Sequence, residues 1–259
     1  MLVHRGQLKR TSLALCAALL LAILPLGAQE TPAPPAARAG EPSRALSPFT
    51  ADYAVYSDGR KLGTATMTLE RAGGGNWRID LDMHGSGLMK MAGLRMRQTT
   101  LFASDGMHYR PLRQVTTRRT LFSERTRTGT YDWDAGVATW TGDVKASRRD
   151  PVPLRAGDLD ALLIDLAVVR DAEPGKTLHY RNVDGGRARE HTYVAAAAPV
   201  SVEIDGLGYS AIKFERVEGN DRTEVWVAKG VPTPVRIYML EDGEDSTDLR
   251  LVGYTGATR

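Results

Sequence analysis

The sequence predicts a mainly β domain, an antiparallel meander that forms a curved sheet, half-barrel or barrel with one amphipathic helix at about residues 157–170. Three observations predict this fold class. Apolar and polar residues alternate with a period of two through most of the chain, short segments rich in Asp, Asn and Gly separate the alternating stretches, and one stretch has helical spacing instead.

The first 28 residues have the layout of a secretory signal peptide. Basic residues up to Arg10 precede an apolar run from Leu13 to Leu24, which Pro25 and Ala28 follow. The run is shorter than the ~20 apolar residues that span a bilayer. We therefore expect cleavage after Ala28, export to the periplasm and no transmembrane anchor in the mature chain.

Removal of residues 1–28 changes the charge and the cysteine content. Three of the 34 Lys and Arg residues lie there, so 31 basic residues balance 31 acidic ones in the mature chain. A net charge of zero argues against a nucleic-acid partner. Cys16, the single cysteine, also leaves, so a disulfide and a thiol nucleophile are excluded. Leu15 is bulkier than a lipoprotein signal requires, and an outer-membrane lipoprotein is not expected.

The composition then separates a linker from a folded domain. Residues 29–48 are rich in Pro and Ala and cannot bury enough apolar surface to order themselves, so we expect a disordered linker. Residues 49–259 remain as a single β-rich domain, long enough to bury a sizeable core.

Fourteen segments of the domain read as strands. Trp77, Ile79 and Leu81 point to one face while Arg78 and Asp80 point to the other, as in a strand with one buried and one solvated face. The segments are 53–57, 62–71, 77–83, 94–103, 107–122, 126–133, 137–141, 177–182, 187–195, 200–204, 211–217, 223–228, 235–240 and 247–254.

The connections have the residues of tight hairpins. Asp, Asn and Gly tolerate the positive φ that such turns require, so consecutive strands are expected to pair antiparallel. Examples are Ser57-Asp58-Gly59, Ser104-Asp105-Gly106, Asp134-Ala135-Gly136, Asp184-Gly185-Gly186, Glu218-Gly219-Asn220 and Glu241-Asp242-Gly243.

One stretch, Gly157 to Val169, predicts a helix. Leu159, Leu162 and Leu166 recur at helical spacing, and Asp158 is the expected N-cap. An amphipathic helix needs an apolar surface, which the open side of a curved sheet supplies.

A glycine-bounded segment, Gly85 to Gly93, reads as neither strand nor helix. It carries Leu88, Met89 and Met91, and apolar residues on such a loop indicate a lid or a rim.

The chain from about Phe49 resembles the exported bacterial proteins grouped as the domain of unknown function DUF3108. The segments that carry the resemblance are Tyr53-x-Val55-Tyr56, Gly59-x-x-Leu62-Gly63, Asp158-x-Asp160-Ala161-Leu162, Val225-Trp226-Val227-Ala228 and Pro234-Val235-Arg236-Ile237. These motifs are structural, and the resemblance implies a periplasmic β-rich domain. The architecture is also similar to that of periplasmic lipoprotein carriers, whose half-barrel holds acyl chains.

No catalytic or metal-binding constellation is visible. Ser86 has glycines directly beside it but lacks those two positions before and after it that the Gly-x-Ser-x-Gly nucleophile elbow requires. The histidines do not form a metal-binding pair. Met83, Met89, Met91, Met96 and Met107 are irregularly spaced, so lining of a core or ligand pocket is favoured over a copper site. We expect a protein that is not an enzyme and has no cofactor.

Arginines crowd the middle of the chain, and meander pairing would bring several of them to one sheet face. A solvated face is the simpler interpretation, and contact with an anionic head group is the alternative. The set is Arg95, Arg97, Arg110, Arg113, Arg118, Arg119, Arg125, Arg127, Arg148 and Arg149, of which Arg95, Arg97, Arg118 and Arg125 are the candidates for anion contact.

The predicted function is binding of a lipid, acyl chain or other amphipathic small molecule at a concave apolar face. The candidate ligand-binding residues are Leu88, Met89, Met91, Met83, Met96, Leu162 and Leu166. The alternative is an envelope scaffold with a filled interior that binds a protein partner through an edge strand or the arginine-rich face. An apolar void would favour the carrier, and a packed interior the scaffold.

Overall fold

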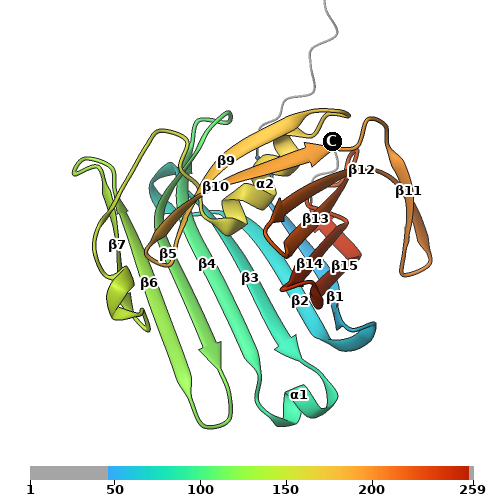
Figure 1. Ribbon diagram of the computed structural model, residues 1–259, viewed down its shortest axis with the longest axis horizontal. Coiled ribbons are helices and arrows are strands. Elements are labelled where there is room, and N and C mark those ends of the chain that lie inside the picture. The colour runs from blue at the N-terminus through green and yellow to red at the C-terminus, as the bar shows by residue number, and fades with distance from the viewer. Residues whose placement is uncertain (1–45, 257–259) are drawn as a thin grey trace, which may run out of the picture. The chain divides into compact units, whose positions relative to one another are not determined.

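The computed structural model describes residues 46–256, and the predicted signal peptide and most of the predicted linker lie outside them. The described chain is mainly β, with two α-helices and two short 3-10 helices (Figure 1). The strands are β1 (Phe49–Ser57), β2 (Arg60–Arg71), β3 (Trp77–Gly85), β4 (Arg95–Ser104), β5 (Tyr109–Arg119), β6 (Glu124–Asp132), β7 (Val137–Gly142), β8 (Val152–Pro153), β9 (Thr177–Asp184), β10 (Arg187–Ala195), β11 (Val200–Ile204), β12 (Leu207–Glu218), β13 (Asp221–Ala228), β14 (Arg236–Glu241) and β15 (Glu244–Gly256). The helices are η1 (Gly73–Gly75), α1 (Gly87–Met91), η2 (Ala146–Arg148) and α2 (Ala161–Asp171).

All strands belong to one curved sheet, which confirms the predicted fold class. Their order is β8-β7-β6-β5-β4-β3-β2-β1-β15-β14-β13-β12-β10-β9, with β11 paired to β12 beside this path. Every strand pair is antiparallel, and β1 joins β15. The first and last strands of the domain are therefore neighbours, and the meander curls into a nearly closed barrel.

Each of the fourteen predicted strand segments coincides with a strand. The alternation that predicted β3 is present in the burial pattern, because Trp77, Ile79 and Leu81 are buried while Arg78 is exposed. The strand that was not predicted is β8, whose two residues are too short to show a period.

Two connections depart from a simple meander. β10 pairs with β12 because β11 forms a hairpin with the far end of β12. β8 does not pair with β9, so these two strands are the edges of the sheet.

The segment before α2 covers the β9 edge. Leu159 forms a parallel bridge with Asn182, in which its N–H donates to the Arg181 carbonyl and its carbonyl accepts from the Val183 N–H. The Arg181 guanidinium also donates to the Asp158 carboxylate at 2.5 Å. The β9 edge is thus covered by a single bridging residue and an ion pair instead of a strand ladder.

The helix α2 is shorter at its start than predicted, and Asp158 is not its N-cap. Asp160 precedes the first helical residue, and its carboxylate accepts from the Leu163 N–H at 3.0 Å. Asp158 instead accepts from the Arg155 N–H at 2.8 Å and pairs with Arg181. Both aspartates precede the apolar stretch, and the contact with β9 decides which of them caps the helix.

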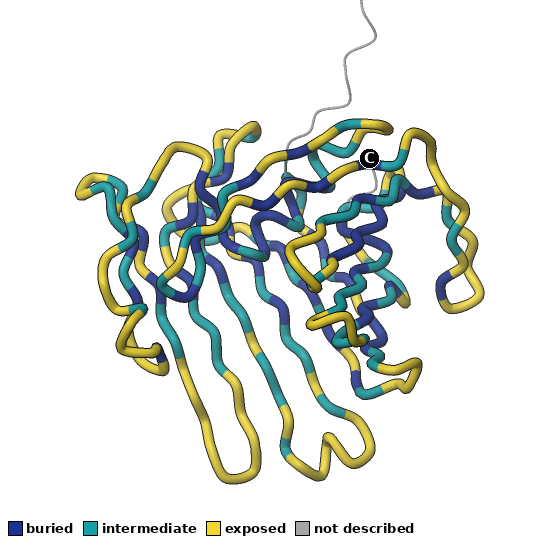
Figure 2. Tube along the Cα trace, in the orientation of Figure 1, coloured by how far each residue is buried: buried dark blue, intermediate teal, exposed yellow. Residues whose placement is uncertain are grey.

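The helix α2 and the inner face of the sheet form the main core. Leu163, Ala167 and Val168 of α2 are fully buried with side chains from β1 to β4 and from β9 to β15. A smaller core lies beside it, around Tyr131, Trp140 and Val183. Figure 2 shows buried stretches around α2 and in the C-terminal strands, whereas the lower halves of β3 to β6 are partly or fully exposed.

The Gly85–Gly93 segment was predicted to be non-helical, and this prediction is wrong. Residues Gly87–Met91 form the short helix α1 at the end of the β3–β4 hairpin (Figure 1). None of its residues is buried, and its first residue, Gly87, has a positive φ of 53°.

Candidate functional site

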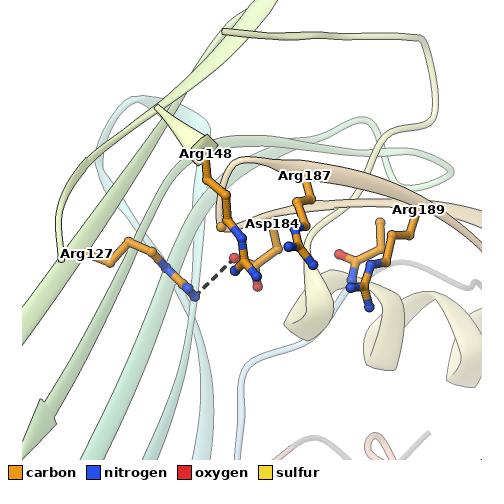
Figure 3. A pocket seen from close by; sticks show the side chains of 7 residues that line it. Arg127, Arg148, Asp184, Arg187 and Arg189 are labelled. Carbon is orange, nitrogen blue, oxygen red and sulfur yellow. Dashed lines mark hydrogen bonds and ion pairs between the residues drawn. The ribbon is translucent and has the colours of Figure 1, made fainter. Parts of the chain in front are cut away.

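A pocket of about 210 Å³ lies between β6, η2 and the β9–β10 hairpin. We call it the arginine pocket, because four guanidinium groups line it together with one carboxylate. Figure 3 shows the arginines converging from different elements around Asp184. Its lining residues are Arg127, Arg148, Asn182, Asp184, Gly185, Arg187 and Arg189.

The β9–β10 hairpin supplies most of the pocket because of its register. Asn182 pairs with Arg189 and Asp184 with Arg187, and paired residues of an antiparallel ladder point to the same side. Arg187 and Arg189 are two residues apart, so they share that side. The hairpin thus places two arginines, an amide and a carboxylate in a row.

The turn of this hairpin requires two glycines. Gly185 and Gly186 have φ of 58° and 74°, in the left-handed region that L side chains rarely adopt. A Cβ on Gly186 would lie 2.0 Å from the Arg148 carbonyl oxygen, and a Cβ on Gly185 would lie 2.9 Å from an Arg127 Nη1. The turn therefore packs directly against the two arginines from β6 and η2.

The carboxylate in the pocket balances only part of its positive charge. Arg127 Nη2 donates to Asp184 Oδ1 at 3.2 Å, and Arg189 lies 3.8 Å from the Glu218 carboxylate outside the pocket. Within the described part of the chain, Arg148 and Arg187 have no carboxylate within 4 Å. The pocket has a surplus of positive charge that an anion would neutralise.

The electrostatics and the hydrogen bonding agree on this surplus. Desolvation lowers the pKa of Arg148, and the positive charges of Arg187, Arg189 and Arg127 lower it further. Three buried polar atoms of the pocket also lack a hydrogen-bond partner among residues 46–256: Arg127 Nε, Arg148 Nε and Asn182 Oδ1. Two of these atoms are N–H donors beside repelling cations, which suits an oxygen-bearing anion, and the third is an acceptor that an anion does not satisfy.

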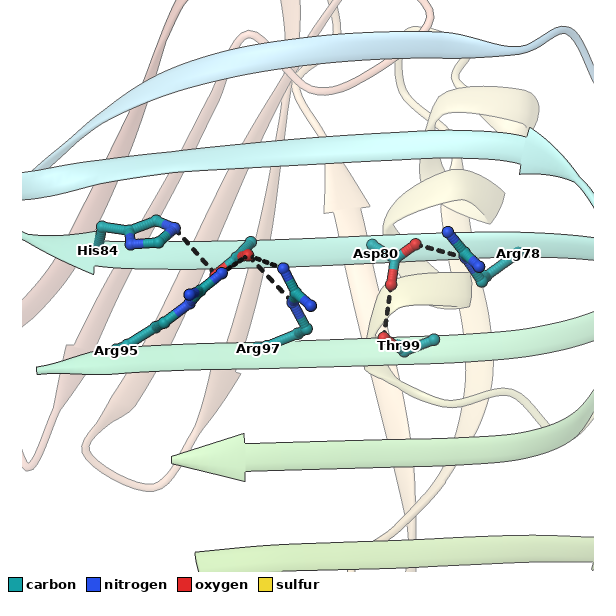
Figure 4. Close-up of polar contacts among 7 residues, drawn as sticks. Arg78, Asp80, His84, Arg95, Arg97 and Thr99 are labelled. Carbon is teal, nitrogen blue, oxygen red and sulfur yellow. Dashed lines mark hydrogen bonds and ion pairs between the residues drawn. The ribbon is translucent and has the colours of Figure 1, made fainter. Parts of the chain in front are cut away.

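The structure divides the four arginines that the sequence indicated. Arg95 and Arg97 lie on the outer face of β4, and both donate to Asp82 (Figure 4). In the strand register, Arg118 of β5 lies opposite Arg125 of β6 and opposite Met96 of β4. Met96 lies between Arg95 and Arg97 in the sequence, so it points to the other face of the sheet, and Arg118 and Arg125 share that face with it. The four residues do not share one sheet face.

Asp82 neutralises much of the charge of its two arginine neighbours. Partial burial acts to raise its pKa, but hydrogen bonds from Arg95 and Arg97 dominate and lower the pKa to about 2. The second pocket, of about 190 Å³, is lined by Arg95, Arg97, Thr117, Arg119 and Glu124. The arginines of this second pocket have carboxylate partners, because Arg95 and Arg97 pair with Asp82 and Arg119 pairs with Glu124. We therefore regard the arginine pocket as the stronger candidate.

The predicted ligand-binding residues fall into three places. Leu162 and Leu166 are 2% and 4% exposed in the core beneath the sheet. Met83 and Met96 are partly buried cross-strand neighbours on β3 and β4. Leu88, Met89 and Met91 are exposed on α1, which Figure 1 shows at the end of the β3–β4 hairpin, away from α2.

The histidines and carboxylates of the described residues form no metal-binding cluster. Residues 46–256 contain no group of three or more His, Cys, Asp and Glu side chains close enough to hold a metal ion. His84 lies 3.2 Å from Asp82 and His108 lies 3.0 Å from Asp105, and both histidines are exposed. In this part of the chain no helix has the length and apolar character needed to cross a membrane.

Arg187 and Arg189 were not among the residues predicted from the sequence. Their signal is local, since two arginines with a spacing of two follow directly after a tight Asp-Gly-Gly turn. Their convergence with Arg127 and Arg148 is not readable from sequence, because it depends on the packing of the β9–β10 hairpin against β6 and η2.

Comparison with solved structures confirms the fold. A crystal structure of a beta-barrel-like protein of the domain of unknown function DUF1849 from Brucella abortus matches with a TM-score of 0.52 and 12% sequence identity. The match covers 83% of this chain and 100% of that one. At this identity it supports the architecture alone.

Comparison with curated proteins finds no match. The family model described as "Protein of unknown function (DUF3108)" matches residues 50–250, which span nearly all of the described domain. The sequence segments that resemble this family lie inside the match, on β1 and β13 and at the starts of β2, α2 and β14. The chain belongs to the DUF3108 family.

Proposed function

We propose that the domain is a binding module for an anionic ligand, which it takes in the arginine pocket. The observation that carries the proposal is the convergence of four guanidinium groups on one pocket with a single carboxylate. Guanidinium groups bind phosphate and carboxylate oxygens through paired hydrogen bonds, so the ligand class is a phosphate- or carboxylate-bearing molecule.

The size of the pocket limits the part of the ligand that it takes. A volume of about 210 Å³ suits a single phosphate, a carboxylate or the head group of a lipid. The amphipathic ligand expected from the sequence remains part of the proposal through such a head group. Contact of an acyl chain with α1 is a prediction that the variant Leu88→Ser with Met89→Ser tests separately from head-group binding. Contact of the chain with Met83 or Met96 stays a prediction.

A scaffold role is the second candidate, and the packing of α2 favours it. The helix fills the concave apolar face with buried side chains such as Leu162, Leu163 and Leu166. A filled interior leaves the edges and surfaces of the sheet as the binding elements. In either role we propose a periplasmic location, which the signal-peptide layout of the first 28 residues supports.

The proposal is tested by calorimetric titration of the domain at fixed ionic strength. The titrants are inorganic phosphate, glycerol 3-phosphate and a short-chain phosphatidic acid below its micelle concentration. The test variant combines Arg148→Gln with Arg187→Gln, and the control is Arg149→Gln, an exposed neighbour that does not line the pocket. We expect the double variant to lose at least tenfold in affinity for each bound anion, while the control binds like the wild type.

The titrants separate the two ligand sources. Equal affinity for glycerol 3-phosphate and the short-chain lipid identifies a free anion, whereas a lipid preference of tenfold or more identifies a head group with its chain. Leu88→Ser with Met89→Ser then tests whether α1 contacts that chain. Absence of binding by any anion, or equal binding by the double variant, would contradict the proposal and favour the scaffold.

A further inference from the structure

The ends of the β3–β4 and β5–β6 hairpins carry a cluster of exposed apolar side chains. Half of the twelve large hydrophobic residues that are exposed in the described chain lie there. Leu88 is 80% exposed and Phe122 is 96% exposed, so the core does not use these side chains. We call the cluster the apolar tip; its members are Leu88, Met89, Met91, Leu94, Leu121 and Phe122.

The two hairpin ends are joined in one structural unit. The Leu121 N–H donates to the Ala92 carbonyl at 3.1 Å, and the Gly85 N–H donates to the Leu94 carbonyl at 3.0 Å. Gly93 permits the approach, because it has a φ of 65° and a Cβ there would lie 3.0 Å from the Leu121 nitrogen. Both hairpins project toward the same end of the domain, where the chain is exposed (Figures 1 and 2).

The two hairpins that carry the apolar tip are also rich in basic residues. Residues 82–97 and 117–126 of these hairpins contain six cationic side chains and only two carboxylates, those of Asp82 and Glu124. We call the cations the basic collar; they are Lys90, Arg95, Arg97, Arg118, Arg119 and Arg125. The chain from residue 29 onward has no net charge, so the surplus of four positive charges is a local feature of these two hairpins.

The collar remains accessible although several of its members are paired. The side chains of Arg119 and Arg125 are 66% and 68% exposed, and their nearest carboxylates are 3.9 Å away. Such long, exposed pairs contribute little to stability. Exchange of these partners for external anions would therefore cost the fold little.

We propose that the apolar tip and the basic collar dock the domain on the surface of a lipid bilayer that contains anionic lipids. Exposed apolar residues rimmed by charge mark interaction surfaces. Basic side chains gain attraction from anionic head groups, while Leu, Met and Phe side chains enter the boundary between head groups and acyl chains. This surface shares no residue with the lining of the arginine pocket, so variants of the pocket arginines test anion binding without changing the docking surface.

The test is flotation of the purified domain with two kinds of vesicles. One kind contains phosphatidylglycerol and phosphatidylethanolamine, and the other contains phosphatidylcholine alone. We expect association with the anionic vesicles that weakens with added salt, and little association with the neutral ones. Absence of the domain from the anionic vesicle fraction at low salt would overturn the proposal.

Two double variants separate the apolar and the electrostatic contributions. Leu88→Ser with Phe122→Ser should weaken vesicle binding by about tenfold or more, because two exposed side chains lose their burial in the interface. Lys90→Gln with Arg119→Gln should weaken it by about tenfold or more, since each basic side chain near an anionic surface is worth roughly fivefold. The remaining binding of the second variant should also depend less on salt.

The matched control combines Leu207→Ser with Lys229→Gln, which are exposed and lie outside the two hairpins. It should bind vesicles like the wild type. Phe122→Trp adds a direct readout of insertion, because brominated lipids should quench its fluorescence beyond the loss seen for the wild type. The proposal would be overturned if both double variants of the two hairpins bound vesicles as tightly as the control does. It would also be overturned if brominated lipids quenched Phe122→Trp no more than they quench the wild type.

Discussion

Asp160 combines a capping role with a buried charge. Its carboxylate accepts from the Leu163 N–H at the start of α2 and from the Thr100 hydroxyl, and the residue is fully buried. Burial raises its pKa from 3.8 to about 7, although both hydrogen bonds act in the opposite direction. The ionised form is therefore costly in the folded domain near neutral pH.

The raised pKa predicts a pH dependence of stability. Between about pH 4 and pH 7 the folded domain binds a proton at Asp160 that the unfolded chain has lost, so stability falls as the pH rises through this window. Asp160→Asn keeps a side chain that caps helices and cannot ionise. Relative to the wild type it should gain roughly 2–4 kcal/mol at pH 8 and little at pH 4, measured by denaturant unfolding.

The same substitution also distinguishes capping from charge. Asp160→Ala removes the cap as well, so it should be less stable than Asp160→Asn at both pH values, by about 1 kcal/mol. A variant Asp160→Asn that follows the wild-type pH profile would show that another group causes the dependence.

At the residue scale the sequence predicted chemistry better than location. It indicated that arginines matter and that an aspartate caps the helix, but it placed the cap on Asp158 because both aspartates precede the apolar stretch. It named Arg95 and Arg97, but the register of β3 and β4 places Asp82 beside both of them as a shared ion-pair partner. Which arginines lack a carboxylate depends on contacts between distant strands.

At the scale of elements, the segment before α2 replaces a missing strand pairing. Asp158 and Arg181 are 1% and 14% exposed at the side chain, and their ion pair connects this segment to the β9 edge. A buried pair whose partner is removed leaves an uncompensated charge.

Asp158→Ala should therefore destabilise the domain by about 3–5 kcal/mol, whereas Asp150→Ala, at an exposed site in the preceding loop, should change stability by less than about 0.5 kcal/mol. Urea unfolding measures both. A loss below about 1 kcal/mol for Asp158→Ala would show that the Leu159 bridge alone holds the edge.

Most elements could be predicted because period-two alternation is a local signal. The fourteen predicted segments are strands, whereas β8 is too short to alternate, and α1 is a single short helix among glycines. The start of α2 was misplaced because Leu159 fits the helical spacing but is held in a bridge to β9. Tertiary contacts thus override local pattern at the sheet edge.

At the scale of the whole molecule, positive and negative charges balance, but positive charge is concentrated locally in the arginine pocket. The chain from residue 29 onward carries equal numbers of acidic and basic residues, yet four arginines share a pocket with one carboxylate. Like charges in one pocket oppose folding, and a binding site is a common reason for such an arrangement. The predicted curved sheet explains how the pocket arises, because its edge hairpin β9–β10 lies against β6 and η2.

The measurement that tests the arginine pocket most directly is the melting temperature of Arg187→Gln in chloride and in phosphate at equal ionic strength. If the pocket binds anions, the variant melts above the wild type in chloride, because one repulsive charge is gone, and it loses most of the rise that phosphate gives the wild type. If Arg187 instead has a structural role, the variant melts below the wild type in chloride and phosphate raises both proteins equally, which would contradict the account.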